Sequence, residues 1–439
     1  MSQPEAQRQD EVKRLEFLFR ALRYRNYRLY FGGQSISLIG TWLTRVATSW
    51  LVYRLTDSAL LLGMVGFAGQ IPTFLLAPLA GVLVDRWDRH RILVITQTLS
   101  MSQSLMLAIL ALMHVIAVWH IIVLSIFQGI INAFDTPARQ AFVVDMVEQR
   151  DDVANAIAMN SSMFNAARLL GPSLAGVLIA TVGEGICFLL DGISYLAVIA
   201  SLWAMKLTPR KIESQRTRVL EGLKEGFTYA FGFAPIKAIL MLIGLVSLMG
   251  MPYVVLMPVI ARDVLRGGPH TFGFLMAASG VGALAGAIYM ASRKSIRGLG
   301  SIMTLSASLF GLGLIALALS RAVWLSLIVM FVTGFGMIVQ MAAGNTVLQT
   351  IVEDDKRGRV MSFYTMAFLG MAPFGSLFAG GLASQIGAPN TILLGGVFCI
   401  FGSILFARKL PSLREIVRPI YVRKGIIEEV ASGIQAATQ

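Results

Sequence analysis

Charged residues are scarce in this sequence. Asp, Glu, Lys and Arg make up 14% of its 439 residues, while 56% are hydrophobic and the mean hydropathy is +0.71. A soluble chain of this length would form domains with charged surfaces, and this chain has too few charges to solvate them. The composition therefore excludes an ordinary soluble protein and predicts a membrane protein.

Cysteines and nucleotide-binding loops are also few or missing. The two cysteines, Cys187 and Cys399, fall in separate apolar stretches, so neither a disulfide framework nor a metal site is expected. No G-x-x-x-x-G-K-S/T run occurs, which argues against ATP as the energy source. Residues 1–28 are polar and basic and do not read as a cleavable signal peptide. We predict no metal, no cofactor and no catalytic residue, and hence not an enzyme.

The chain does contain a series of apolar stretches of membrane-spanning length. A helix rises 1.5 Å per residue, so about 20 residues cross a hydrocarbon core ~30 Å thick. Twelve stretches are predicted: 27–54, 60–84, 92–113, 118–142, 155–182, 186–205, 236–265, 271–291, 298–319, 322–352, 360–386 and 389–407. We expect an all-α membrane protein with twelve transmembrane helices.

The net charge of +13 is distributed unevenly among the loops. If the N-terminus is cytoplasmic, most of the 37 Lys and Arg lie in cytoplasmic segments, and the outer loops hold Arg54, Arg262, Arg266 and Arg321. This positive-inside pattern predicts a multi-pass protein of the cell (inner) membrane with both termini in the cytoplasm. The charge would face the anionic lipid bilayer, so no nucleic-acid partner is needed to explain it.

The two halves of the chain repeat each other at an offset of about 205 residues. Trp119 corresponds to Trp324, and Gly129 to Gly334. Parallel repeats are typical of carriers whose substrate site lies between two bundles. We predict two pseudo-symmetric six-helix bundles. The expected parts are a basic cytoplasmic N-terminus (1–26), an N-terminal bundle (27–205), a cytoplasmic connector (206–235), a C-terminal bundle (236–407) and a cytoplasmic tail (408–439).

A short charged turn, GVLVDRWDRHRIL from Gly81 to Leu93, separates the second and third stretches. Its counterpart in the second half, GAIYMASRKSIRGL, has Met290 where the first half has Asp85. The acid therefore belongs to one half only. A turn that merely connects two helices would not need this asymmetry, so we interpret it as a functional loop.

Four ionisable residues lie within or near the edges of the apolar stretches: Arg45, Asp135, Arg168 and Asp191. Asp135 is ~24 Å along its helix from Trp119, at the level of the charged turn. We predict that it pairs with an arginine of that turn and closes a cytoplasmic gate. Alternatively, Asp135 or Asp191 carries a coupling proton, or Asp191 is simply hydrated near the outer surface. The predicted gating residues are Gly81, Asp85, Arg86, Arg89 and Asp135.

Polar residues recur every three or four positions in the first, fourth and tenth stretches, which places them on one face of each helix. Such a face either makes hydrogen bonds to another helix or lines water. Arg45 favours water, because a charge at the membrane midplane costs roughly 2.5–3.5 kcal/mol. The predicted cavity-lining residues are Gln34, Thr41, Arg45, Thr48, Gln128, Asn132, Gln340 and Asn345.

The fifth stretch contains ARLLGPSLAG, from Ala167 to Gly176. Proline inside a helix removes a backbone hydrogen bond and kinks the helix, and small residues beside it permit close packing. An ordinary proline-kinked span is one interpretation. The other is a transport motif made of Arg168, Gly171, Pro172 and Gly176.

From about residue 17 to 407 the chain resembles transporters of the major facilitator superfamily. The charged turn is similar to the superfamily signature G-x-L-x-D-R-x-G-R-x-x-x-L, with Asp88 in place of its second Gly. The fifth stretch resembles the antiporter motif G-x-x-x-G-P-x-x-G-G of drug–proton exporters, with Ala167 and Ala175 as departures. Ser125 stands where proton-coupled exporters have an arginine, so the usual proton relay lacks that group. The runs QGIINAFDTPARQAF and DDKRGRVMSFYTMAF resemble the enterobactin-exporter-like and multidrug efflux branch.

This resemblance implies a secondary active transporter that exports a small amphipathic solute (a drug, siderophore or metabolite) by alternating access in exchange for protons. The expected partners are the small-molecule substrate, the proton and the lipid bilayer, and the expected state is a monomer. Two alternatives remain open: a gradient-driven importer (symporter or uniporter) of a small nutrient, and a non-transporting receptor or scaffold. The polar faces and Asp85 argue against a scaffold, and only the motif in the fifth stretch argues against import.

Overall fold

The computed structural model describes residues 19–206, 227–293, 295–353 and 356–426, with the side chains of Pro78 and Asp85 left out. Over these residues the chain forms helices and no strand. The prediction of an all-α fold is therefore confirmed. The predicted connector (206–235) and both terminal segments lie largely outside the described residues.

Each of the first six predicted stretches forms one helix. These are α2 (Arg25–Thr56), α3 (Ala59–Arg86), α4 (Arg89–Leu112), α5 (Val118–Asp145), α6 (Arg150–Val182) and α7 (Glu184–Trp203), preceded by the short helix η1 (Arg20–Arg23). Side-chain caps set two of the boundaries. Ser58 accepts a hydrogen bond from the Leu61 amide, and Asp88 accepts one from the His90 amide. Asp88, which departs from the superfamily signature, thus begins α4.

The second half is less regular. Its helices are α9 (Ala234–Leu245), the π-helical η2 (Val246–Gly250), α10 (Tyr253–Val259), the π-helical η3 (Ile260–Val264), α11 (Pro269–Ser292), α12 (Leu299–Leu319), α13 (Val323–Ile351), α14 (Arg357–Phe368), α15 (Ala372–Ile386) and α16 (Ala388–Arg423). The helix α16 continues to Arg423, beyond the predicted apolar stretch, which ends at 407. Leu413 and Val417, one turn apart, are buried and stabilise this extension.

Eleven of the described helical stretches are long and apolar enough to cross a membrane. α2 is not among them, although its 32 residues exceed the required length. Its polar stripe and its arginines lower its hydropathy. That α2 lines a pathway stays a prediction.

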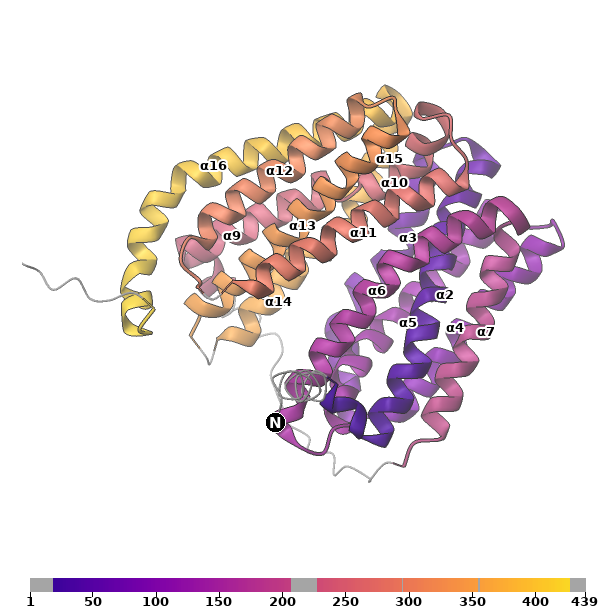
Figure 1. Cartoon of the computed structure of the whole chain (residues 1–439), viewed down its shortest axis with the longest axis horizontal. Coiled ribbons are helices and arrows are strands. Elements are labelled where there is room, and N and C mark those ends of the chain that lie inside the picture. Colours follow the sequence, from indigo (N-terminus) through magenta and orange to yellow (C-terminus); the bar gives the residue numbers. More distant parts are fainter. Residues whose placement is uncertain (1–18, 207–226, 294, 354–355, 427–439) are drawn as a thin grey trace, which may run out of the picture. The chain divides into compact units, whose positions relative to one another are not determined.

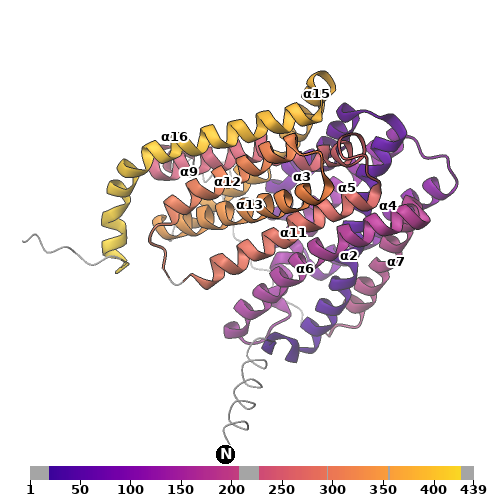
Figure 2. The ribbon, with the colours of Figure 1, turned by 45° about the horizontal axis from the view of Figure 1, so that its top comes forward.

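The chain divides into two compact units. Unit 1 comprises Met1–Gln215, Val254–Gly280 and Ser376–Gln385, and unit 2 comprises Arg216–Tyr253, Val281–Gly375 and Ile386–Gln439. In unit 1, α2 packs on α6 and α7, α3 packs on α5, and α4 packs on α5 and α7 (Figure 1). In unit 2, α12 packs on α13 and α16, and α9 packs on α16 (Figure 2).

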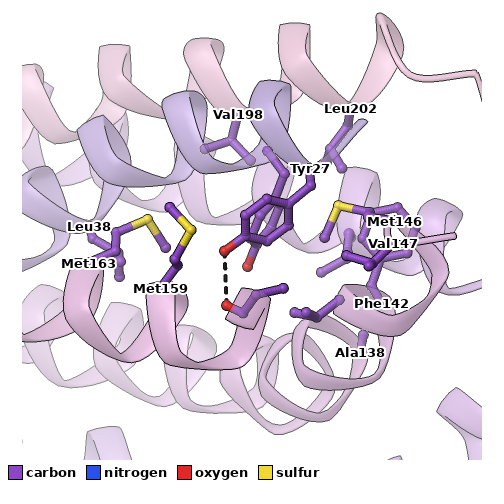
Figure 3. Packing of buried hydrophobic residues seen from close by; sticks show 14 of the residues in the cluster. Tyr27, Leu38, Ala138, Phe142, Met146, Val147, Met159, Met163, Val198 and Leu202 are labelled. Atoms are coloured by element: carbon purple, nitrogen blue, oxygen red, sulfur yellow. Dashed lines mark hydrogen bonds between the residues drawn. The ribbon is translucent and has the colours of Figure 1, made fainter. Parts of the chain in front are cut away.

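A buried cluster around Tyr27 fixes how α2 lies on α6 (Figure 3). The Tyr27 hydroxyl donates a hydrogen bond to the Ala156 carbonyl (2.9 Å) or to the Asn160 side chain (3.1 Å). Further along both helices, Gly171 lies directly against Trp42. Since residue numbers rise together from one contact to the other, α2 and α6 run parallel.

Candidate functional site

Asp135 is a buried carboxylate between α5 and α4. It accepts hydrogen bonds from Thr96 (2.9 Å) and Gln97 (2.7 Å) of α4 and pairs with Arg139 of its own helix. The predicted pairing with an arginine of the charged turn is therefore wrong. Residues four apart on a helix are neighbours, which brings Arg139 within reach of Asp135.

The charged turn is tied to α5 through a different acid. Arg89 pairs with Asp145 at the end of α5 (3.1 Å) and donates to the Ala141 carbonyl (3.3 Å). Arg86 is exposed at the end of α3, and a Cβ at Gly81 would meet nothing within 4 Å. The sequence analysis missed Asp145, although its place at the end of the same span as Asp135 was visible. The Asp85 side chain lies outside the described residues.

Asp191 of α7 is a second buried carboxyl group, 2% exposed. Its Oδ2 accepts hydrogen bonds from Thr44 of α2 (2.7 Å) and Ser104 of α4 (2.8 Å). Its Oδ1 has no hydrogen-bond partner and lies beside Gly40, where a Cβ would stand 2.7 Å away. Within the described parts of the chain, no Lys or Arg pairs with it. Asp191 thus connects three helices, and the interpretation of a hydrated surface residue is wrong.

The predicted cavity-lining residues differ in exposure. Gln34 and Gln340 are buried, and neither polar side-chain atom of Gln340 has a hydrogen-bond partner. Gln128 donates to Ser100 (3.2 Å) and Asn132 (3.1 Å), so hydrogen bonds within and between helices account for part of the polar faces. Arg45 is exposed, and the remaining members are half-buried: Thr41, Thr48, Gln128, Asn132 and Asn345. A water-lining role for these residues stays a prediction.

The glycines of the fifth-stretch motif lie at close helix contacts in α6. Gly171 contacts Trp42, as described above. A Cβ at Gly176 would stand 2.8 Å from the Pro269 carbonyl and 3.0 Å from the Gly273 Cα of α11, in the same compact unit. Only glycine permits backbones to approach this closely without displacement.

A second contact of this kind joins α3 and α15, again inside unit 1. A Cβ at Gly380 would stand 2.7 Å from both the Gly63 Cα and the Ala59 carbonyl. Gly380 corresponds to Gly176 in the repeat. Each half of the sequence thus supplies one equivalent glycine to a close backbone contact.

These observations describe a helical membrane protein in which the buried Asp135 pairs with an arginine, whereas the buried Asp191 pairs with no Lys or Arg among the described residues. The model of the transmembrane secretion effector family matches residues 18–419 of the chain. The chain belongs to this family. It is a membrane transporter of the major facilitator superfamily, and not an enzyme.

Curated relatives cover most of the transporter. The staphyloferrin A transporter of Staphylococcus aureus is 27% identical and covers 86% of this chain and 95% of its own. The multidrug efflux pump Tap of Mycolicibacterium fortuitum is 26% identical, with 86% of this chain and 93% of its own covered. The macrolide efflux protein A of Streptococcus pyogenes is 25% identical, and the match covers 90% of this chain and 98% of the relative.

Solved structures show the same fold. A bacterial homologue of the human lysosomal transporter Spinster has a TM-score of 0.71 at 13% identity, covering 89% of this chain and 98% of its own. A POT family transporter has a TM-score of 0.67 at 14% identity, and the match covers 89% of this chain and 99% of that transporter. The family match and the curated relatives place the transporter in a cell membrane, with a small molecule as its substrate.

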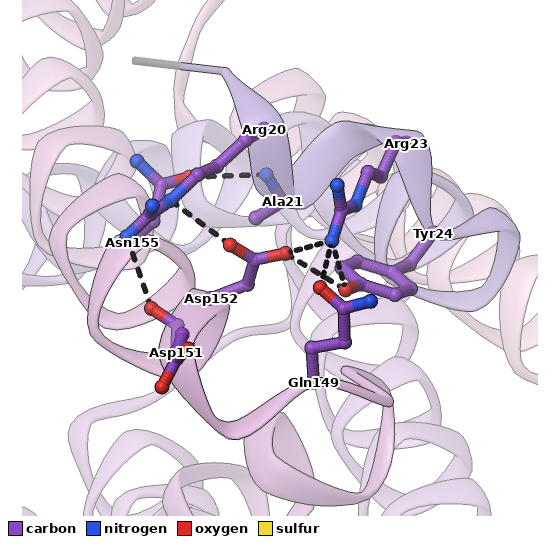
Figure 4. A network of polar contacts seen from close by, with 8 residues as sticks. All are labelled: Arg20, Ala21, Arg23, Tyr24, Gln149, Asp151, Asp152 and Asn155. Carbon is purple, nitrogen blue, oxygen red and sulfur yellow. Dashed lines mark hydrogen bonds and ion pairs between the residues drawn. The ribbon is translucent and has the colours of Figure 1, made fainter. Parts of the chain in front are cut away.

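The transporter also contains a polar network that the sequence analysis missed (Figure 4). Asp152, buried near the start of α6, pairs with Arg20 (3.0 Å) and Arg23 (2.5 Å), and Tyr24 donates a hydrogen bond to it (2.7 Å). The hydrogen bond to Tyr24, and to a smaller extent the charge of Asp152, raise the pKa of Arg23. The network anchors η1 to α6. No sequence signal connected these residues, because more than a hundred positions separate them.

A further pair of polar contacts lies at the far end of α2, within unit 1. Asp57 pairs with Arg262 (2.5 Å), and Tyr53 donates a hydrogen bond to Asp263. Sequence analysis had assigned Arg262 only to an outer loop. Its ion pair connects the α2–α3 turn to the segment that follows α10.

Proposed function

We propose that the transporter exports a small amphipathic solute in exchange for protons, and that Asp191 carries the proton. Export is supported by relatives named as efflux proteins, which match nearly the whole chain. It is also supported by the glycine and proline motif of α6, which resembles that of drug–proton exporters. The observation that carries the coupling proposal is that Asp191 is buried and pairs with no Lys or Arg among the residues that the structure describes.

A carboxylate is expensive to bury when no positive charge accompanies it. Two hydroxyl donors, Thr44 and Ser104, offset only part of that cost. The buried carboxyl group is therefore favoured in its neutral form and must gain a proton when water leaves the site. A group that binds a proton when closed and releases it when wetted has the property that an antiporter requires.

Asp135 differs from Asp191, because an arginine accompanies its buried carboxylate. Its charge is balanced by Arg139 and by hydrogen bonds from Thr96 and Gln97. A paired carboxylate is stable in its charged form. We assign Asp135 to holding α5 against α4, and the proton to Asp191.

The direction of exchange follows from the proposed orientation. The positive-inside pattern puts both termini in the cytoplasm and the start of α7 at the outer surface. Asp191 then lies about 11 Å from the outer end of α7, nearer the source of protons in an energised bacterium. One charge falling through 100 mV releases roughly 2.3 kcal/mol, enough for about a fiftyfold solute gradient.

We further propose that the charged turn gates the cytoplasmic side. Arg89 and Asp145 connect it to α5, so movement of α3 and α4 against α5 would break this ion pair. Asp85, Arg86 and Gly81 complete the predicted gate. Because the Arg89–Asp145 pair is only partly buried, it stabilises the arrangement by on the order of 1 kcal/mol. Either residue can therefore exchange its partner easily.

Drug susceptibility tests export. A bacterial strain that lacks the transporter is complemented with wild type, Asp191→Asn or the control Asp151→Asn, an exposed acid at the start of α6. Growth is then measured with a panel of drugs that includes macrolides. We expect wild type and Asp151→Asn to restore resistance and Asp191→Asn to fail at equal membrane abundance. Increased sensitivity on expression of wild type would indicate import instead.

A further inference from the structure

Two arginines flank a close contact between α2 and α6. Trp42 lies against Gly171, Arg45 follows Trp42 by three residues, and Arg168 precedes Gly171 by three residues. Residues three apart share a helix face, so both arginines lie along the seam between these parallel helices. Their Cα atoms are offset by about 9 Å along the helix axes, which two long arginine side chains can bridge.

Both arginines are near the middle of the membrane span. Arg45 is within about 7 Å of the midpoint of α2, and Arg168 within about 3 Å of the midpoint of α6. Arg45 is nonetheless exposed, and Arg168 is half-buried. An exposed guanidinium at this depth faces either lipid or a water-accessible space. The cost of placing it in lipid favours the accessible space.

The two positive charges are close enough to oppose each other. The Arg45 guanidinium lies over the Trp42 ring, 4.8 Å from its centroid, and the charge of Arg168 acts against that of Arg45. Within the described residues, no acid forms an ion pair with Arg45. Like charges held near each other repel, and an anion placed between them would relieve that repulsion.

We propose that Arg45 and Arg168 bind an anionic group, such as a carboxylate, of the transported solute. This inference rests on the proposed function and adds the substrate class. Guanidinium groups bind carboxylates through two parallel hydrogen bonds, which lysine cannot reproduce. The exposed Phe164, whose ring centroid is 6.2 Å from that of the buried Trp42, provides an apolar surface for the rest of an amphipathic molecule.

A matched pair of ligands tests the proposal. Binding of 2-naphthylacetate and of its uncharged amide is measured by calorimetry on the purified transporter in nanodiscs, without any ion gradient. We expect the carboxylate to bind at least about tenfold more tightly than the amide, as a charge-assisted hydrogen-bonded pair would give. Arg45→Gln and Arg168→Gln should each abolish this preference, and Arg45→Lys should retain part of it.

The exposed Arg28, on the same helix, supplies the control: Arg28→Gln should leave the preference unchanged. Equal affinity for the two ligands in wild type, or no binding of the carboxylate at millimolar concentration, would overturn the proposal. So would a preference that survives in both glutamine variants. Because the assay uses no gradient, its failure would leave proton-coupled export standing. Loss of resistance in Asp191→Asn tests that function separately.

Discussion

At the scale of single residues, two of the buried acids of the N-terminal half, Asp135 and Asp191, differ in what surrounds them. Asp135 has a cation and two donors, whereas Asp191 has two donors and no cation among the described residues. On this contrast rests our proposal that Asp135 stabilises the structure and that Asp191 carries the proton. The two assignments can be separated by substituting each acid with its uncharged isostere.

Asp135→Asn should destabilise the transporter, because it leaves Arg139 without its carboxylate. We expect a loss of about 1–3 kcal/mol, since Arg139 is partly accessible to water. Asp191→Asn should change stability little, because the amide oxygen still accepts hydrogen bonds from Thr44 and Ser104. Thermal unfolding in nanodiscs measures both effects. Equal destabilisation by the two substitutions would contradict the assignment.

Asp85→Asn should reduce transport at least several-fold with unchanged membrane insertion, because the proposed gate loses its acid. Transport is measured by drug susceptibility and insertion by the amount of protein in isolated membranes. Asp88→Asn is a suitable control, since asparagine also caps a helix well. Unchanged transport in Asp85→Asn would remove Asp85 from the gate.

The sequence analysis singled out Asp135 and Asp191, which the structure shows to be buried, but it did not predict their partners. The sequence shows that Asp135 and Arg139 are four residues apart. The prediction relied instead on depth along the helix axis, which does not tell in which direction a side chain points from the helix. The contact of Asp191 with Thr44 joins residues 147 positions apart. Only the packing of α2, α4 and α7 brings these side chains together, so no local pattern could reveal it.

At the scale of helices, membrane thickness is what made prediction possible. Each of the twelve predicted stretches is helical in the structure, because the hydrocarbon core requires both apolar length and satisfied backbone groups. The π-helical turns η2 and η3 were not predicted. Such turns depend on contacts with neighbouring helices. Gly250, at the end of η2, lies so close to Phe310 of α12 that a Cβ there would overlap the ring.

Gly171→Ala should weaken the α2–α6 contact, because the added methyl group would overlap the Trp42 side chain. We expect a loss of about 1–3 kcal/mol of stability, as for other overpacked sites. Gly81→Ala is the matched control: it places the same methyl group in open space on α3, where alanine also favours the helix. Equal unfolding temperatures for the two variants would show that Gly171 is not needed for packing.

At the scale of the whole molecule, the repeat predicts two halves and the charge distribution predicts the orientation, and both stay predictions. The close contacts at Gly176 and at Gly380 involve equivalent positions of the two halves. The compact units nevertheless do not coincide with the sequence halves, since unit 1 includes Val254–Gly280 and Ser376–Gln385. The sequence repeat reflects a common ancestry of the two halves. The compact units are defined by contacts in space, so a unit can include segments from both halves.

Cysteine labelling tests the orientation. Both native cysteines are buried, so the background reaction should be low. Val115→Cys, in the α4–α5 loop, should react with a membrane-impermeant maleimide in intact cells, whereas Glu148→Cys, in the α5–α6 loop, should react only after permeabilisation. The reverse pattern would place the termini outside the cell.

Solute accumulation in everted membrane vesicles tests the central claim most directly. The vesicles are prepared from cells that express wild type or Asp191→Asn, a pH gradient with an acidic interior is imposed without ATP, and uptake of a radiolabelled drug to which the transporter confers resistance is followed. The account predicts accumulation by wild type that collapses when the pH gradient is dissipated, and no accumulation by Asp191→Asn. Accumulation that is independent of the gradient, or equal in the two proteins, would contradict it.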